Sequence, residues 1–348
     1  MADVKVDPVL GRIAESRVGE GPGGAPELKK WGGKPAAPLP GAAWFDQFKY
    51  DAATLSNGLG TERQWYALNY TSCLVRGFCD LGVIREALAG EGVHPVGAVR
   101  AGSSTPMAMA TIWFNVIHDS VCGSYHEVVL SFDVSKTNKD AIAFTEGGLA
   151  GAPWALQYAN FGPSVCDAQF LHSLWINSPL SIAWGREMQG FPKHPKPVAS
   201  TITDDGDAFA FDLKWDANNV MRGRAKKRFG FIPFNVQGLG LVGANGPIAV
   251  TKFLLGSSFD IPILMPTKTA AQNNVPRDYL GHLWKGLNPF AVQVWPWGEG
   301  DTFELGDHTE PSGCEDHNGQ ALLKKAGFTP VVVTYLPRVA AIVEGVKG

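Results

Sequence analysis

Lys193 is the residue best placed for covalent chemistry, because the preceding segment predicts a short helix that ends just before it. Ser178 can accept a hydrogen bond from a free backbone N–H at the helix start, and Pro179 suits the first helical position. Gly190 suits the left-handed position after a helix, and Pro192 prevents continuation. Lys193 is therefore expected to have lost freedom that a surface lysine keeps.

A lysine amine attacks a ketone only when it is unprotonated, and a free lysine is almost wholly protonated at neutral pH. Burial in apolar surroundings favours the neutral amine because it lowers the pKa. Position alone leaves a second interpretation open, in which Lys193 is an ordinary solvated lysine of a loop. The basic neighbours His194 and Lys196 fit either interpretation.

The segment around this lysine resembles acetoacetate decarboxylase, a family in which an apolar stretch precedes Gly-Arg-Glu and then an aromatic-Pro-Lys-Lys run. The matching residues here are Gly185-Arg186-Glu187 and Phe191-Pro192-Lys193-His194. The first lysine of the family's pair is the Schiff-base nucleophile, so the resemblance implies that role for Lys193. His194 replaces the second lysine, which implies a weaker electrostatic neighbour because imidazole is mostly neutral at pH 7.

Three further segments carry the resemblance in the family's order, from about Arg63 to the C-terminus. Arg63 matches an arginine that handles the substrate carboxylate, and the segment Leu336-Pro337-Arg338 matches the family's terminal Leu-Pro-Arg. Between them, a His-Asp segment and a Tyr-x-Glu segment include His118, Tyr125 and Glu127. The resemblance implies proton transfer by Glu127 and a place near the substrate for His118 and Tyr125.

Trp113 marks a departure from the family's pattern. By position, it replaces an acidic residue in the strand before the His-Asp segment. An indole in place of a carboxylate removes a possible proton carrier and reshapes the pocket. We therefore expect Trp113 to contact a substrate that is larger, flatter or more apolar than acetoacetate.

One glycine-rich segment could suggest a dinucleotide site, and one segment with histidines and acids could suggest a metal site, but both have simpler explanations. Residues 238–243 spell GxGxxG, but Asn245-Gly246-Pro247 blocks the helix that a dinucleotide site requires, so a glycine-rich strand or bend is expected. Residues 307–317 contain two histidines and several acids in no compact ligand spacing. No cofactor and no metal are expected.

A basic run is expected to form a solvated turn rather than a nucleic-acid site, because nucleic-acid binding needs more than one short cluster on an acidic chain. Its members are Arg222, Arg224, Lys226, Lys227 and Arg228.

The elements that must position these residues are mostly strands. The patterns predict strands at residues 63–71, 108–118, 127–134, 207–215, 290–297 and 329–336, and short helices at 80–90 and 319–326. Many strands without regular β-α-β alternation favour an antiparallel sheet or barrel of the α+β class. The resemblance implies an antiparallel cone-like β-barrel with peripheral short helices. Residues 1–41 are expected to be an extended or disordered arm, and residues 42–348 a single acetoacetate-decarboxylase-like domain.

Composition narrows the functional classes. The chain has 348 residues, 45% of them apolar, and a net charge of −3, which is typical of a globular protein that does not bind nucleic acid. No run approaches the roughly 18 apolar residues of a membrane span, and the N-terminus lacks the apolar region of a secretory signal. Five cysteines without a CxxC pair indicate a reducing compartment, so a cytoplasmic location is expected.

The leading hypothesis is a Schiff-base-forming lyase that decarboxylates a β-keto acid through an iminium on Lys193. Arg63, Glu127 and His194 would complete its catalytic residues, and its partner would be a small keto acid or related carbonyl compound. One alternative is a Schiff-base aldolase, dehydratase or hydrolase of secondary metabolism on the same fold. Another is a non-catalytic barrel that binds an apolar ligand. The N-terminal arm and the resemblance both suggest a homo-oligomer.

Overall fold

The computed structural model describes strands and short helices from Trp65 onward. The described residues are 65–100, 102–120, 122–142, 168–178, 181–182, 191–193, 198–215, 217–227, 258–264, 281–287, 293–306 and 318–346. The predictions for the arm at 1–41, for the GxGxxG segment and for residues 307–317 lie outside these ranges.

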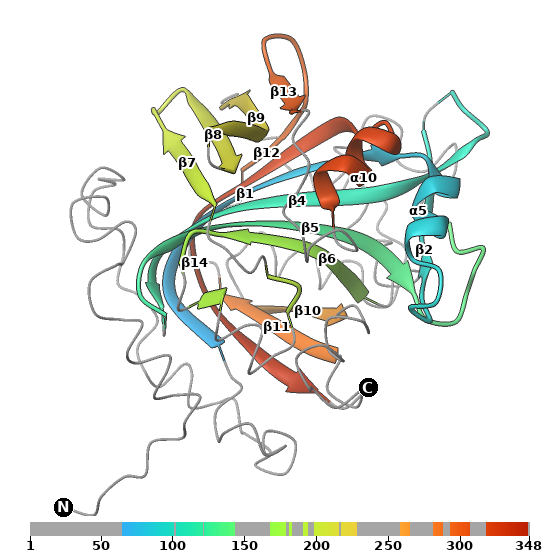
Figure 1. Ribbon diagram of the computed structural model, residues 1–348, viewed down its shortest axis with the longest axis horizontal. Helices are drawn as coiled ribbons and strands as arrows, with labels where there is room; N and C mark the ends of the chain where they lie inside the picture. The colour runs from blue at the N-terminus through green and yellow to red at the C-terminus, as the bar shows by residue number, and fades with distance from the viewer. Residues whose placement is uncertain are drawn as a thin grey trace, which may run out of the picture.

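Two sheets account for most of the described chain (Figure 1). The larger consists of β1 (Trp65–Cys79), β2 (His94–Pro95), β3 (Gly97–Val99), β4 (Pro106–Ser120), β5 (Tyr125–Ser135), β6 (Ala168–Ile176), β10 (Ser258–Leu264), β11 (Gly281–Leu287), β12 (Gln293–Pro296) and β14 (Thr329–Val346). The smaller consists of β7 (Ala199–Asp204), β8 (Ala208–Trp215), β9 (Asn218–Lys226) and β13 (Thr302–Leu305). The short helices α5 (Leu81–Ala87) and α10 (Gly319–Lys325) complete the set, which confirms the sheet-rich α+β class.

The larger sheet has the strand order β2-β5-β6-β10-β11-β14-β1-β4-β3, and β4 also pairs with β5. Most neighbours are antiparallel, as predicted, but β6 and β10 run parallel. The antiparallel prediction is wrong for this pair. Parallel strands need a connection that runs back to the end of the sheet where the first strand began, and the long segment between β6 and β10 can provide it, whereas a hairpin cannot. That connection also contains β7, β8 and β9. The cone-like barrel stays a prediction.

The two faces of the larger sheet bury different clusters. Because side chains alternate along a strand, Trp113, Asn115 and Ile117 of β4 face one way and Phe114 faces the other. On the Phe114 side, the smaller sheet packs through the stacked rings of Phe114 and Phe211, whose centroids are 3.9 Å apart. We call this side the outer face and the opposite side the inner face.

Helix α10 lies directly on the outer face of the larger sheet. A side chain at Gly319 would meet the Ser173 hydroxyl and the Trp175 ring, each at 2.7 Å, so the helix can approach these strands only through a glycine. Its predicted start is confirmed, since Asn318 accepts a hydrogen bond from the backbone N–H of Ala321 at 2.8 Å. Gly327, with φ of 61°, follows the helix in the left-handed conformation expected there.

The first predicted helix is also confirmed. The Asp80 carboxylate accepts a hydrogen bond from the backbone N–H of Val83 at 2.8 Å, which caps the start of α5. None of the helices in the described part of the chain is long and apolar enough to cross a bilayer. Cys73, Cys79 and Cys122 are buried and form no disulfide among the described residues, and burial raises the pKa of Cys79 to about 12, in keeping with inert thiols.

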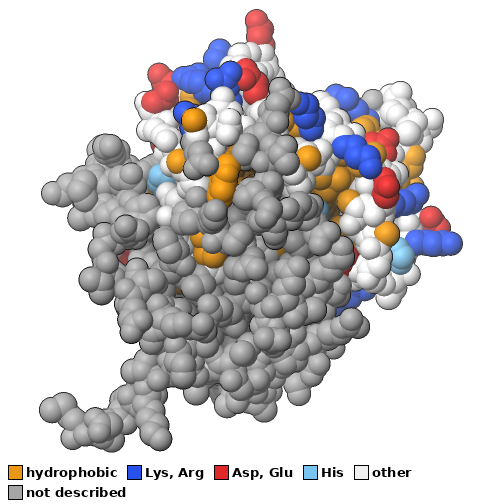
Figure 2. Space-filling model, viewed as in Figure 1, with side chains coloured by type: hydrophobic (Ala, Val, Ile, Leu, Met, Phe, Trp, Pro, Cys, Tyr) orange, Lys and Arg blue, Asp and Glu red, His pale blue; other side chains and the backbone are white. Residues whose placement is uncertain are grey.

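The basic run is placed on a strand rather than in a turn, so that prediction is wrong for the described residues. Arg222 and Arg224 lie on β9 and contact acids of neighbouring segments, Glu304 at 2.6 Å and Asp205 at 3.2 Å. Figure 2 shows basic and acidic side chains interspersed over this part of the surface. The turn prediction failed because Arg222 and Arg224 alternate with the buried Met221 and Ala225, which is the pattern of a half-buried strand.

Candidate active site

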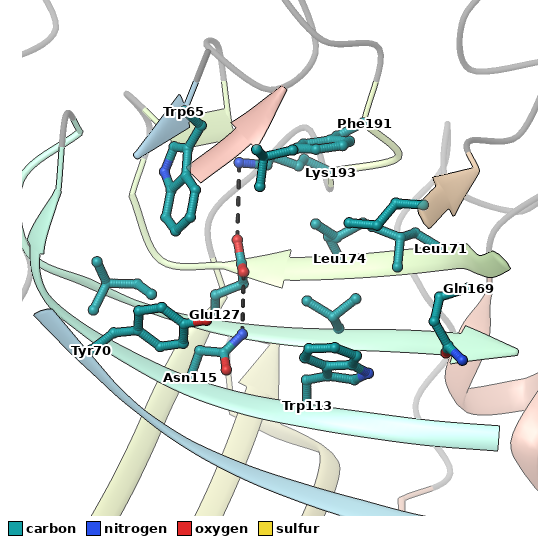
Figure 3. A pocket seen from close by; sticks show the side chains of 14 residues that line it. Trp65, Tyr70, Trp113, Asn115, Glu127, Gln169, Leu171, Leu174, Phe191 and Lys193 are labelled. Carbon is teal, nitrogen blue, oxygen red and sulfur yellow. Dashed lines mark hydrogen bonds and ion pairs between the residues drawn. The ribbon is translucent and has the colours of Figure 1, made fainter. Parts of the chain in front are cut away.

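A pocket lies on the inner face of the larger sheet (Figure 3). Most of its lining is apolar or aromatic, contributed by Trp65, Tyr70, Trp113, Ile117, Val129, Leu171, Leu174, Phe191, Ile263 and Val343. The polar lining residues are Asn115, Glu127, Gln169 and Lys193. An amine, a carboxylate and two amides are thus gathered in an otherwise apolar space.

Lys193 reaches this pocket because its backbone is attached to the edge of β6. It forms a bridge with Leu174, whose backbone N–H donates to the Pro192 carbonyl at 3.3 Å. Phe191 and Lys193 are 6% and 2% exposed, so both side chains turn inward. The alternative of a solvated loop lysine is therefore wrong.

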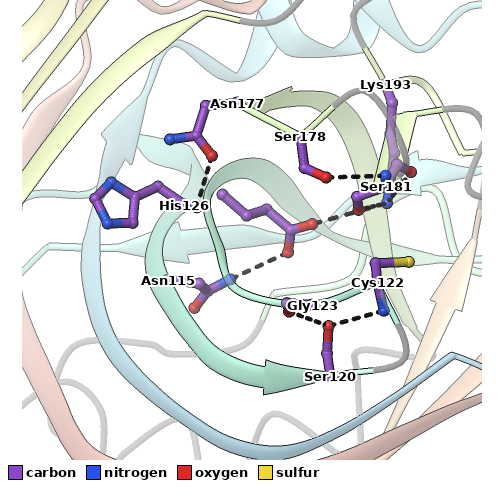
Figure 4. Close-up of polar contacts among 10 residues, drawn as sticks. Asn115, Ser120, Cys122, Gly123, His126, Asn177, Ser178, Ser181 and Lys193 are labelled. Atoms are coloured by element: carbon purple, nitrogen blue, oxygen red, sulfur yellow. Dashed lines mark hydrogen bonds and ion pairs between the residues drawn. The ribbon is translucent and has the colours of Figure 1, made fainter. Parts of the chain in front are cut away.

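The turn at Ser178 places an acceptor pair beside the lysine amine. The Ser178 hydroxyl accepts from the backbone N–H of Ser181 at 3.2 Å, as expected of a helix-capping serine. Ser181 and Ile182 are helical, and the rest of the predicted helix lies outside the described residues. Lys193 Nζ donates to the backbone oxygen and to the hydroxyl of Ser181, each at 2.9 Å (Figure 4).

Glu127 lies across the pocket from this amine, with its Oε2 atom 4.0 Å from Lys193 Nζ. The pKa of Lys193 is lowered, chiefly because burial disfavours the ammonium, while Glu127 and Cys122 act in the opposite direction. The pKa of Glu127 is raised, chiefly by burial, against the influence of Lys193 and Asn115. Burial thus moves both groups toward their neutral forms.

Asn115 fixes the position of the Glu127 carboxylate. The two residues are cross-strand partners on β4 and β5, and Asn115 Nδ2 donates to Glu127 Oε1 at 3.3 Å. Ser72 of β1 in turn donates its hydroxyl proton to Asn115 Oδ1 at 2.7 Å. This bond identifies Oδ1 as the acceptor, so the amide N–H group is directed at the carboxylate.

Of the residues assigned to substrate binding, Trp113 lines the pocket and His118 does not. His118 lies on the other side of β4, where its Nε2 atom is 2.9 Å from the Thr71 hydroxyl. Tyr125 pairs with Ile117 across the strands and is 1% exposed. The pKa of Tyr125 is raised well above 10, first by burial and then by the nearby Glu127 carboxylate.

The structure brings Lys193, Glu127 and Trp113 together, and Tyr125 is buried near Glu127. Arg63 and His194, the other two predicted catalytic residues, lie outside the described residues, so their roles stay predictions. Among the described residues, no cluster of three metal-ligating side chains occurs.

Sequence reasoning missed Asn115, Ser181 and Gln169. Asn115 was detectable, because the hairpin between β4 and β5 places it opposite Glu127 and on the same face as Trp113. Ser181 and Gln169 gave no comparable signal. Their roles depend on a bridge and on a strand order that join distant parts of the chain.

No protein-family model matches the sequence, and no curated protein matches it. The comparison with solved structures does find likenesses. The acetoacetate decarboxylase of Legionella pneumophila is 12% identical with a TM-score of 0.45, over 81% of this chain and 86% of its own. An acetoacetate decarboxylase-like enzyme from Sphingomonas wittichii is 13% identical with a TM-score of 0.43, over 82% and 91%.

The enduracididine biosynthesis enzyme MppR, solved in complex with pyruvate, is 11% identical with a TM-score of 0.40, over 81% of this chain and 87% of its own. The chain is therefore similar in structure to acetoacetate decarboxylases and to enzymes related to them. With TM-scores of 0.40–0.45, these likenesses carry no weight for the reaction, which has to be inferred from the pocket itself.

Proposed function

We propose that the pocket is the active site of a Schiff-base-forming lyase that decarboxylates a β-keto acid through an iminium on Lys193. One observation carries the proposal: a buried lysine amine of lowered pKa lies 4.0 Å from the Glu127 carboxylate in a largely apolar pocket. Perturbed groups of this kind, held together in a pocket, are typical of catalytic sites.

The contacts of the amine suit nucleophilic attack. A neutral amine has two N–H donors and one lone pair, and Lys193 has two acceptors on Ser181 at 2.9 Å. When both N–H groups are directed at Ser181, the lone pair is directed elsewhere and is available to a carbonyl carbon. Ser181 is 0% exposed, so water does not compete for these bonds.

In the proposed reaction, the amine adds to the ketone and forms a carbinolamine. Loss of water gives an iminium, whose positive nitrogen accepts the electron pair when the bond to the carboxylate carbon breaks and CO₂ leaves. The resulting enamine takes a proton on carbon and returns to an iminium. Hydrolysis then releases the ketone and restores the Lys193 amine.

Glu127 is the proton carrier in this sequence. As a carboxylic acid, it donates a proton to the hydroxyl that leaves the carbinolamine, and as a carboxylate it accepts one from the water that attacks the iminium. Its raised pKa brings both forms nearer to neutral pH, which favours this exchange. The hydrogen bond from Asn115 holds the carboxylate toward Lys193.

The substrate is a small keto acid, and its carboxylate is expected to be handled by Arg63. We also propose that the larger sheet forms a cone-like barrel around the pocket. In support, β4 pairs with β1 at one end of the path of strands that begins at β5, and β4 also pairs with β5 itself.

Borohydride trapping tests the proposal. The protein is incubated with a panel of β-keto acids, reduced and mapped by peptide mass spectrometry, while CO₂ release is measured in parallel. We expect an adduct on Lys193, and a fall in turnover of at least about 10⁴-fold in a Lys193→Ala variant. Lys325→Ala removes an exposed lysine paired with Glu86 and should leave both readouts unchanged.

Absence of an adduct with every keto acid, together with turnover that survives Lys193→Ala, would overturn the mechanism. An adduct without CO₂ release would retain the iminium and replace decarboxylation with aldol-type or dehydration chemistry.

A further inference from the structure

A chain of buried polar side chains holds Trp113, one of the residues that line the pocket. The Trp113 indole N–H donates to the Ser131 hydroxyl at 3.0 Å, and that hydroxyl donates to Gln169 Oε1 at 2.9 Å. Gln169 Nε2 donates to Asp133, which also accepts from the Arg76 guanidinium at 2.5 Å. Ser131, Gln169 and Asp133 are at most 3% exposed.

The direction of every hydrogen bond in this chain follows from its charged end. A carboxylate paired with a guanidinium only accepts, so the Gln169 amide must present its NH₂ group to Asp133 and its oxygen to Ser131. Ser131 has a single hydroxyl proton, and that oxygen, at 2.9 Å, is a nearer acceptor than the Thr111 carbonyl at 3.4 Å. The remaining capacity of the Ser131 hydroxyl is to accept, which matches the indole N–H of Trp113.

The indole is consequently fixed in orientation. Turning the ring about its side-chain bonds would break the N–H bond to Ser131 and leave a buried hydroxyl short of a donor, which is unfavourable. Trp113 still lines the pocket, and Figure 3 places it across from Lys193. The neighbouring walls are the apolar side chains of Val129, Leu171 and Leu174.

We infer that Trp113 is a specificity-determining residue whose fixed ring selects β-keto acids that carry an uncharged aryl group beyond the ketone. The inference rests on the proposed iminium at Lys193. A rigid indole favours a flat ring over a saturated group of similar size, because stacked aromatic pairs gain more than their buried area alone provides. Ser131, Asp133 and Arg76 act on the substrate only through Trp113 and are positioning residues, whereas Gln169 also lines the pocket.

Three substrates test the inference on the full-length protein: acetoacetate, 3-oxo-5-phenylpentanoate and 3-oxo-5-cyclohexylpentanoate. For each, the Lys193 adduct is trapped with borohydride, and kcat/KM for CO₂ release is measured. The phenyl compound should exceed the cyclohexyl compound by about 5- to 10-fold in kcat/KM. Trp113→Leu should bring that ratio close to one, and Trp113→Phe should retain part of it.

Ser131→Ala provides the readout for positioning. It should lower the phenyl-to-cyclohexyl ratio by about 2- to 5-fold, and Ser131→Thr, which keeps the hydroxyl, should restore it. A general loss of folded protein would lower both rates together and leave the ratio unchanged. If Trp113→Leu does not fold, Trp113→Phe and the two Ser131 variants still measure the ratio.

The outcomes separate this inference from the proposed function. Adducts and CO₂ release without a preference for phenyl, or with a preference that survives the Trp113 and Ser131 variants, would overturn the inference and leave the lyase standing. Failure of all three compounds to modify Lys193 would overturn the lyase and the inference together.

Discussion

Two oppositely charged pairs are buried in the larger sheet, and they differ in how well each charge is compensated. Arg76 and Asp133 are in contact at 2.5 Å, and Asp133 accepts a further hydrogen bond from Gln169. Lys193 and Glu127 are 4.0 Å apart, beyond hydrogen-bonding distance, and burial moves the pKa of each toward its neutral form. The same sheet thus holds one tightly compensated ion pair and one loosely coupled, titratable pair.

The difference shows how distance and hydrogen bonding decide what a buried charge can do. An ion pair in direct contact can offset its desolvation and stay charged, which suits a structural role. When the two charges lie one or two ångströms farther apart than in direct contact, their attraction leaves the cost of desolvation largely uncompensated. Each group can then lose and regain its proton. The first arrangement can hold a wall in place, and the second can perform acid–base chemistry.

The largest expected effect concerns stability and falls on the tight pair. Arg76→Met leaves Asp133 buried without its cation, so the free energy of unfolding should fall by about 3–5 kcal/mol in denaturant titrations. Arg222→Met breaks an exposed pair with Glu304, and the loss there should be within about 1 kcal/mol. Equal losses in the two variants would contradict the structural role of Arg76.

The next effect concerns catalysis and falls on the loose pair. Glu127→Gln removes the proton carrier, and kcat for CO₂ release should fall by about 10²- to 10³-fold. Glu304→Gln, on the exposed side of the smaller sheet, is the matched control and should have no effect. A Glu127→Gln variant with full activity would remove Glu127 from the mechanism.

The same Glu127→Gln variant also tests the coupling of the pair. Because Glu127 raises the pKa of Lys193, removing its charge should lower that pKa further. The pH at which borohydride trapping of Lys193 reaches half its maximal rate should therefore move to lower pH. A shift to higher pH would show that the carboxylate does not stabilise the ammonium.

A smaller effect is expected at the acceptor pair of the lysine. Ser181→Ala removes one of two hydrogen bonds to Lys193 Nζ, and adduct formation should slow by about 10-fold, the equivalent of one such bond. Ser181→Thr keeps the hydroxyl and should recover most of the rate. Equal rates in wild type and Ser181→Ala would mean that the backbone oxygen suffices to orient the amine.

The smallest expected effect is on stability at the loose pair, and it depends on pH. The lowered pKa of Lys193 means that the unfolded chain binds more protons than the folded one between that pKa and 10.5, the ordinary pKa of lysine. Stability therefore rises with pH in that window. Lys193→Met removes this slope and should cost less than about 1 kcal/mol at neutral pH.

Urea unfolding of both proteins at several alkaline pH values checks this prediction. The variant's stability relative to wild type should be highest below the folded pKa of Lys193 and should decline as the pH approaches 10.5. A large loss of stability at neutral pH, like that expected for Arg76→Met, would show that Lys193 and Glu127 form a structural ion pair after all.

The parts of the molecule that sequence could predict are those determined by local pattern. The alternation of Phe209, Phe211 and Leu213 predicted β8, and Asp80 marked the start of α5. Lys193 and Glu127 came from the resemblance, and the approach through Pro192 predicted a restrained lysine but left its burial open.

Other features depend on pairings between distant segments and were out of reach. The position of His118 depends on which face of β4 turns inward, and a one-residue difference in register decides that. The parallel pairing joins β6 with β10, and the hydrogen-bond chain from Arg76 to Trp113 joins residues of β1, β4, β5 and β6. Side-chain type alone does not reveal such contacts.

The pairing of β1 with β14 has a consequence for how the protein acquires activity. Trp65 pairs with Val343, and both line the pocket, so the site contains residues that are far apart in the sequence. A growing polypeptide cannot complete this site until β14 has left the ribosome. Bringing β14 to β1 closes a long loop, which is slow because the chain loses conformational entropy before the strand contacts form. The pairing of β14 with β1 is therefore expected to limit the rate of folding.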